Sequence, residues 1–158
     1  GAECLVIVAG GLPPGSRDIV AARQMVADGL AATLPYARSC NMPLAIEPLH
    51  PMTAADRCVV STLGQALDLC DQFGEGVGVT IDTYHVWWDP DLARQIARAG
   101  AGGRILAHHS CDWLVPTRDL VSDRGMMGDG VIDLRGFRRM IEAAGFHDGI
   151  DRAGRNAR

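Results

Sequence analysis

The chain has 158 residues, 47% of them hydrophobic, which suffices for one domain with a core but gives no grounds for two. Its 15 basic and 19 acidic residues give a formal net charge of −4, so a broad phosphate-binding surface is not expected and nucleic acid is disfavoured as a partner. The five cysteines are odd in number and lack a C-x-x-C spacing, which favours reduced thiols and a cytoplasmic location.

The first predicted element is a strand from Leu5 to Ala9, an apolar run closed by Gly10-Gly11 and typical of a strand buried on both faces. The run is much too short to cross a bilayer and no basic segment precedes it, so neither a membrane span nor a signal sequence is expected. A helix is predicted next, with Ser16 as its N-cap. Its inward face is predicted from side chains at helical spacing: Ile19, Ala22, Val26, Leu30, Thr33, Leu34 and Ala37.

The second predicted unit is a strand from Leu44 to Glu47, ended by Pro48, and a helix. Thr62 and Gln65 have the spacing of a capping box at the start of that helix. Gly74 is expected to end it, because glycine is the usual residue just after a helix. This unit therefore carries clear start and stop signals.

Two more strand–helix units follow. The strand from Val77 to Asp82 precedes Asp89-Pro90, a cap with proline at the first helical position, and that helix is expected to end at Gly100. The strand from Ile105 to His109 is followed by a long loop and a last helix from Leu134 to Ala144. Four alternating units predict parallel strands with helical crossovers, either in an open doubly wound sheet or in about half of an eight-stranded (β/α)8 barrel.

Three of these strands end in the same way, with a small residue followed two places later by a potential metal ligand. The tripeptides are Ala45-Ile-Glu47, Thr80-Ile-Asp82 and Ala107-His-His109. Because strand side chains alternate between faces, Glu47, Asp82 and His109 are expected to converge on one face. Taken singly, each is more often a helix cap or turn former than a functional residue. Together they predict a metal site and favour the barrel, where functional groups gather at the carboxyl ends of the strands.

Several neighbouring residues have two interpretations. Alternation turns His108 toward the helices, which leaves His109 as the predicted ligand. His50 either lines the pocket or shapes the turn after Pro48. Of Trp87 and Trp88, one is expected to pack in the core and one, taken as Trp88, to contact substrate.

The loop after the last strand carries three residues whose roles stay open. Asp112 is either a partner that orients His109 or a turn acid. Met126 and Met127 are either a flexible lid over the substrate or an apolar plug.

Four stretches together resemble the sugar phosphate isomerase/epimerase group of the xylose isomerase-like TIM barrels. The resemblance extends from about Cys4 to about Gly145, with the motifs in the family's order. It implies a partial TIM barrel over residues 1–145. The stretches are LAIEPLHPM, TIDTYHVWWDPDL, ILAHHSCDW and DRGMMGDGVIDL.

The resemblance implies one divalent ion, Mn²⁺, Mg²⁺, Co²⁺ or Zn²⁺, held by two Glu, one Asp and one His. Glu47, Asp82 and His109 match three of these ligands. His85 and Arg124 match the family's substrate-binding histidine and arginine, and His50 and Trp88 are further substrate-binding candidates.

The implied reaction interconverts sugars or sugar phosphates by moving a proton beside a carbonyl through an enediolate. In this family the two metal-bound Glu serve as acid and base, so Glu47 is the expected catalytic residue. Its partner is expected on a strand after the last helix, but GFHDGIDRAGRNAR does not read as a strand, and Asp151 is a poor substitute. We therefore expect 146–158 to be an irregular, disordered or frame-altered tail, and the natural start to lie upstream of Gly1.

This interpretation predicts an incomplete enzyme that is weak or inactive alone, with open sheet edges that favour self-association or a homo-oligomer. Two alternatives remain. One is a non-catalytic fragment or assembly component. The other is an endonuclease IV-like DNA repair enzyme, which needs further His and carboxylate ligands and a basic surface that the net charge of −4 does not provide.

Overall fold

A computed structural model of the chain describes residues 1–147. Its main sheet has four strands, all parallel, in the order β1-β2-β3-β4. Of the predicted tail at 146–158, the part from 148 onward lies outside the described residues. The strands are β1 (Leu5–Ile7), β2 (Leu44–Ile46), β3 (Val77–Asp82) and β4 (Ile105–His109).

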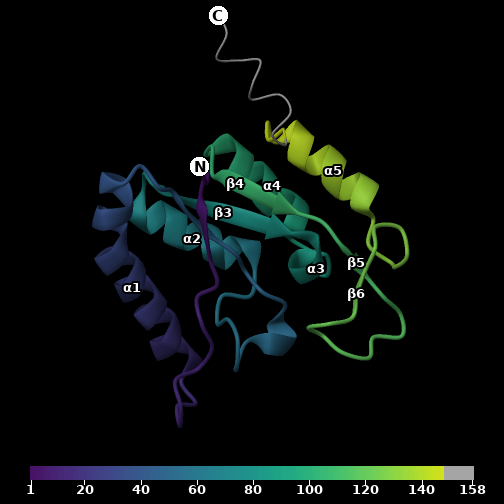
Figure 1. Cartoon of the computed structure of the whole chain (residues 1–158), viewed down its shortest axis with the longest axis horizontal. Coiled ribbons are helices and arrows are strands. Elements are labelled where there is room, and N and C mark those ends of the chain that lie inside the picture. The colour runs from purple at the N-terminus through teal and green to yellow at the C-terminus, as the bar shows by residue number, and fades with distance from the viewer. Residues whose placement is uncertain (148–158) are drawn as a thin grey trace, which may run out of the picture.

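A long helix follows each strand, which confirms the predicted parallel α/β architecture of four strand–helix units. Figure 1 shows α2 and α4 behind the sheet, with α5 beside α4 and α1 at the opposite end. α2 packs on β3 and on α4, and α4 packs on α5. These helices are α1 (Ile19–Ser39), α2 (Leu63–Phe73), α4 (Leu92–Ala101) and α5 (Leu134–Ala143).

The loops contain short elements that the sequence did not predict. A turn of 3-10 helix, η1 (Pro51–Thr53), follows β2, and the four-residue helix α3 (Thr83–Val86) follows β3 directly. After β4, β5 (Asp112–Trp113) and β6 (Arg124–Gly125) pair antiparallel. The predicted long loop is therefore folded over the carboxyl end of the sheet. No helix within residues 1–147 is long and apolar enough to span a membrane.

The predicted start of α1 is wrong by two residues. Asp18, not Ser16, is the N-cap, because its carboxylate accepts the backbone N–H groups of Val20 and Ala21. The Ser16 hydroxyl instead accepts the N–H of Asp18. The cap prediction for α2 is confirmed, since the Thr62 hydroxyl accepts the N–H of Gln65.

Both predicted ends of α4 need correction. Asp89 accepts the backbone N–H of Asp91 in a turn that precedes the helix, so the N-cap is Asp91. The helix also continues through Gly100 to Ala101. A Cβ on Gly100 would collide with the backbone of Ala144, so this glycine permits α4 and α5 to approach closely rather than ending the helix.

The core lies between the central strands and α2, whereas β1 is an edge strand. The expectation that β1 is buried on both faces is wrong, because Leu5 is 50% exposed and Val8 is 48% exposed. The reason is that β1 pairs only with β2 in the described part of the chain. All three residues of β2 and all six of β3 are buried.

Candidate metal centre

The three predicted ligands meet at the carboxyl ends of neighbouring strands. Glu47 directly follows β2, and Asp82 and His109 are the last residues of β3 and β4, where the strand register places them side by side. One ligand atom from each residue lies within 4.8 Å of the others. The structure therefore brings together the set that alternation and strand spacing indicate.

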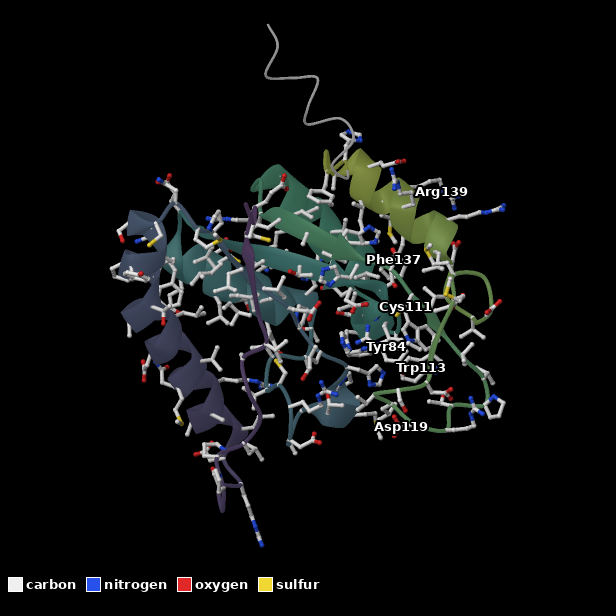
Figure 2. All side chains as sticks on the ribbon, in the orientation of Figure 1. Tyr84, Cys111, Trp113, Asp119, Phe137 and Arg139 are labelled. Atoms are coloured by element: carbon white, nitrogen blue, oxygen red, sulfur yellow. The ribbon has the colours of Figure 1, made fainter. Side chains whose placement is uncertain are left out.

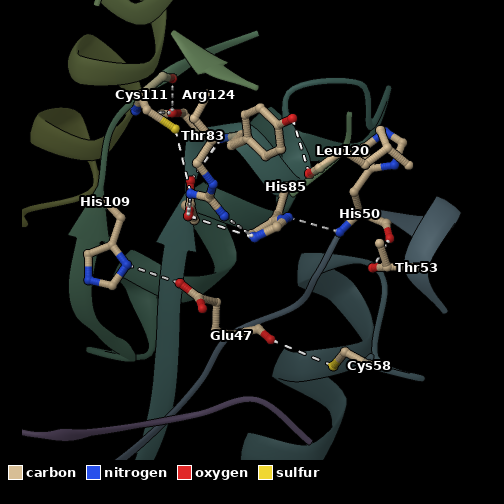
Figure 3. A network of polar contacts seen from close by, with 12 residues as sticks. Glu47, His50, Thr53, Cys58, Thr83, His85, His109, Cys111, Leu120 and Arg124 are labelled. Carbon is tan, nitrogen blue, oxygen red and sulfur yellow. Dashed lines mark hydrogen bonds and ion pairs between the residues drawn. The ribbon is translucent and has the colours of Figure 1, made fainter. Parts of the chain in front are cut away.

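Glu47 is buried and sits beside a second carboxylate. Its Oε1 lies 3.0 Å from Nδ1 of His109 (Figure 3). Burial and the charge of Asp82 raise the pKa of Glu47, while His109 and Arg124 oppose this rise. Glu47 is thus closer to accepting a proton near neutral pH than a solvated glutamate is.

Asp82 uses each carboxylate oxygen in a different contact. Oδ1 accepts the backbone N–H of Tyr84 at 2.9 Å, which caps α3. Oδ2 accepts a hydrogen bond from Nη1 of Arg124 at 2.9 Å. The Asp82 side chain is only 4% exposed, so its charge is compensated inside the protein rather than by water.

His109 is the most open of the three, with 49% of its side chain exposed. His108 lies on the opposite side of β4, where its Nε2 is 3.1 Å from the Ser110 hydroxyl. It does not belong to the metal-ligand group. The placement of the two histidines agrees with the alternation argument.

Two of the four predicted substrate-binding residues, His85 and Arg124, also face the centre. His85 is buried in α3, with Nε2 at 3.9 Å from Oδ2 of Asp82. Burial lowers the pKa of His85 to about 4, partly offset by Asp82 and reinforced by Arg124, so the imidazole is neutral at neutral pH. Nη2 of Arg124 lies 2.9 Å from Nε2 of His85 (Figure 3).

His50 shapes the turn after Pro48, and its ring packs against two neighbouring tryptophans. Its Nδ1 accepts the backbone N–H of Met52 and caps η1, which makes it a turn former. Its ring also packs near Trp113 and Trp88, at centroid distances of 4.9 and 5.9 Å. Trp88 in turn donates from Nε1 to the backbone oxygen of His85. His50 and Trp88 therefore belong to the wall beside the centre.

Sequence reasoning missed the support that β5 and β6 give to this wall. Trp113 stacks on Tyr84 at 4.7 Å, and the Arg124 guanidinium lies 4.6 Å from the centre of the Tyr84 ring. Figure 2 shows Tyr84, Cys111 and Trp113 grouped beside the β5–β6 loop. The available signal was position alone, since Tyr84 lies between Asp82 and His85.

Asp112 is a turn acid. Its carboxylate accepts the backbone N–H groups of Trp113, Gly128 and Ile132, and the residue is 1% exposed. Although burial raises its pKa, these backbone bonds lower it on balance. Asp112 therefore fixes the loop that carries Arg124.

Met126 and Met127 are 74% and 64% exposed, which disfavours an apolar plug.

The donor set suits a divalent cation. Two carboxylate oxygens and one imidazole nitrogen are ligands that Zn²⁺, Mn²⁺ and Co²⁺ accept. Two neighbouring buried carboxylates also repel one another unless positive charge lies between or beside them. The residues present therefore fit a cation at this position.

The chain is similar to several solved structures. It is 72% identical to the protein SMc04130 from Sinorhizobium meliloti 1021, with a TM-score of 0.91 over 92% of this chain and 53% of that one. It is 21% identical to the 3-keto-D-glucoside 4-epimerase YcjR from E. coli, with a TM-score of 0.67 over 90% and 52% of the two chains. It is 22% identical to the IOLI protein with a bound zinc atom, with a TM-score of 0.66 over 90% of this chain and 50% of that one. No curated protein matches the chain.

The chain thus spans about half the length of these solved proteins. The similarities at 21% and 22% identity show the fold alone. Residues 1–150 match the xylose isomerase-like TIM barrel family. The four strand–helix units are therefore a partial (β/α)8 barrel with their ligand cluster at the carboxyl ends of the strands, and the chain belongs to the xylose isomerase-like TIM barrel family.

Proposed function

We propose that this chain provides the metal-binding part of a sugar or sugar-phosphate isomerase or epimerase. Glu47, Asp82 and His109 would hold one divalent cation. The observation that carries the proposal is their convergence within 4.8 Å at the end of the sheet where TIM-barrel enzymes place their active sites. YcjR, a 3-keto-D-glucoside 4-epimerase, and the zinc-bound IOLI protein share this fold, which supports the reaction class and the metal.

The proposed reaction moves a proton on a carbon next to a carbonyl. A divalent cation held by Glu47, Asp82 and His109 would supply the positive charge that stabilises an enediolate. Glu47 is the proposed base, because its buried carboxylate lies within the ligand cluster, with Oε1 at 3.0 Å from Nδ1 of His109. Isomerisation and epimerisation then differ in where the proton returns.

The surrounding residues would bind and orient the sugar. The neutral His85 ring has one N–H and one acceptor nitrogen, which suits a hydroxyl group. Arg124, whose side chain is 39% exposed, offers five N–H donors to hydroxyl or phosphate oxygens. His50 and Trp88 provide ring faces for the C–H surface of the sugar.

The chain alone is proposed to bind metal but to turn over substrate weakly or not at all. It spans about half the length of its solved relatives, and the second Glu that the family resemblance implies has no match among the described residues. A solved structure titled AP endonuclease, family 2, from Brucella melitensis shares this fold at 18% identity, which keeps the endonuclease alternative as a second candidate. Two observations disfavour it: within 1–147 the ligand group has three members, and the chain's net charge is −4.

Calorimetric titration with Mn²⁺ tests the metal site. It also distinguishes the proposed metal enzyme from the alternative that the chain is a non-catalytic component. The unmodified chain should bind one ion. Glu47→Gln and His109→Gln should each weaken binding by more than about tenfold, since even the loss of a group that only orients a metal ligand costs about 10–100-fold. His108→Gln is the matched control, since it removes the adjacent histidine from the other face, and its affinity should be unchanged. Binding that does not depend on Glu47 would favour the non-catalytic interpretation.

Solvent deuterium exchange tests the chemistry independently of full turnover. With Mn²⁺ and a panel of ketoses, the chain should exchange the C–H proton beside the carbonyl, as followed by NMR. Glu47→Gln should abolish the exchange, because it removes the proposed base. Equal exchange by Glu47→Gln and the unmodified chain would reject Glu47 as that base.

A further inference from the structure

The backbone of Arg124 lies outside the main sheet, but its guanidinium reaches the candidate metal centre. It lies in β6, 42 residues beyond Asp82, yet its Nη1 donates to Asp82 Oδ2 at 2.9 Å. The other oxygen, Oδ1, already accepts the N–H of Tyr84. The guanidinium thus occupies the Asp82 oxygen that has no other hydrogen-bond donor among the described residues.

The second contact of this guanidinium is poorly matched. Nη2 of Arg124 faces Nε2 of His85 at 2.9 Å, while the backbone N–H of His50 faces the other ring nitrogen, Nδ1, at 3.2 Å. A neutral imidazole can accept at only one nitrogen, and a protonated one at neither. In every protonation state at least one donor therefore faces an N–H group, so His85 cannot satisfy both contacts.

The remaining contacts of Arg124 are weak. They are a 3.6 Å contact from Nη1 to the Cys111 sulfur, a weak acceptor, and the face of the Tyr84 ring at 4.6 Å. The loop itself is fixed separately, by the three backbone N–H groups that Asp112 accepts. The side chain can therefore leave Asp82 without the loop unfolding, and Asp82 is its main anchor.

We propose that Arg124 is a displaceable counter-cation: it neutralises Asp82 in the metal-free chain, and a divalent ion arriving at Asp82 releases it. This inference rests on the proposed metal site. A cation at Asp82 would lie close to the guanidinium, and two positive charges at one carboxylate repel. The released side chain keeps its five donors and becomes available to substrate oxygens. Metal binding would then precede and promote substrate binding.

Calorimetric titration of the full chain with Mn²⁺ tests this device. Arg124→Gln removes the competing charge, so its Mn²⁺ affinity should rise by about fivefold or more, the usual lower range of coupling between two ligands at linked sites. Arg124→Lys keeps the charge but lacks the planar guanidinium that contacts two partners at once. Its Mn²⁺ affinity should therefore lie between those of the unmodified chain and Arg124→Gln. Arg139→Gln, which removes an equal charge from an exposed position on α5, should change little.

The outcomes distinguish failure of the counter-cation proposal from failure of the metal site itself. Equal or weaker Mn²⁺ affinity in Arg124→Gln, with Glu47-dependent binding intact in the unmodified chain, would overturn the counter-cation and leave the metal site standing. Absence of Glu47-dependent binding in every variant would overturn both. Should Arg124→Gln fail to fold, the side-chain N–H signals of Arg124 in the unmodified chain decide by NMR. Their shift on adding Zn²⁺ supports displacement, and their persistence at saturation rejects it.

Discussion

At the scale of single residues, the centre depends on buried acids whose charge is compensated in different ways. Asp82 is compensated by Arg124 and by the N–H of Tyr84, whereas Asp112 is compensated entirely by backbone N–H groups. Glu47 has the least compensation, and burial raises its pKa. Hydrogen bonds therefore stabilise the charged form of Asp112, the acid that holds the loop. Glu47, the proposed base, is the acid whose surroundings favour taking up a proton.

Asp112→Asn should destabilise the chain at neutral pH by about 1–3 kcal/mol, because the amide turns an N–H donor toward backbone donors that the carboxylate accepts. The sign of the pH dependence follows from its lowered pKa. Its stabilisation is present above the ordinary value of 3.8 and is lost as the pH falls through the folded-state value. Urea unfolding at pH 7 and pH 3 should therefore show the difference between variant and parent shrinking in acid.

The control for that comparison is Asp129→Asn, which changes an exposed acid in the same loop. It should leave the free energy of unfolding almost unchanged at both pH values. An equal effect of the two substitutions would show that Asp112 does not fix the loop through its carboxylate.

At the scale of elements, close packing of helices on the sheet positions the strand ends. α4 approaches α5 where Gly100 meets Ala144, and the helix passes through that glycine without ending. By contrast, Gly29 in α1 has open space where a Cβ would be. The two glycines occupy similar backbone but opposite packing environments.

This contrast gives a paired prediction in guanidinium unfolding. Gly29→Ala should stabilise the chain by about 0.5–1 kcal/mol, because alanine has the higher helix propensity and nothing opposes it. Gly100→Ala gains the same propensity but must separate α4 from α5, so a net loss of about 1–2 kcal/mol is expected. Stabilisation by both substitutions would contradict the assigned contact between the helices.

The elements that local rules govern could be predicted from the sequence, and those set by distant contacts could not. Period-2 alternation and strand spacing sufficed to place Glu47, Asp82 and His109 on one face. Helix ends were missed where a side chain formed a local turn, as Asp89 does, or where a glycine served packing, as Gly100 does. The β5–β6 pairing could not be predicted because it depends on how a long loop returns to the sheet.

At the scale of the whole molecule, the sheet ends in strands that each pair on one side only within residues 1–147. β1 exposes Leu5, and Val8 follows it, 48% exposed. An apolar groove also lies between this edge and α1, lined in part by Ile7, Met25 and Val26. Unpaired strand edges with apolar neighbours favour association with another chain. We therefore propose that the chain self-associates through this edge.

Sedimentation equilibrium at low salt should then give a mass above the 16.8 kDa of one chain. Val8→Lys should shift the equilibrium toward the monomer, because a charged residue at a strand edge disfavours pairing. Val20→Lys, at a 73% exposed position on α1, is the control and should leave the mass unchanged. A compact monomer of the unmodified chain at all concentrations would argue against an associating edge.

The account as a whole depends on one cation being shared by three strand ends. Crystals of the chain soaked in Mn²⁺ and measured near the manganese absorption edge would locate the ion directly by its anomalous signal. The account predicts one strong peak in contact with Glu47, Asp82 and His109, with the guanidinium of Arg124 withdrawn from Asp82. Manganese bound elsewhere, or no peak among these three side chains at a saturating concentration, would contradict it.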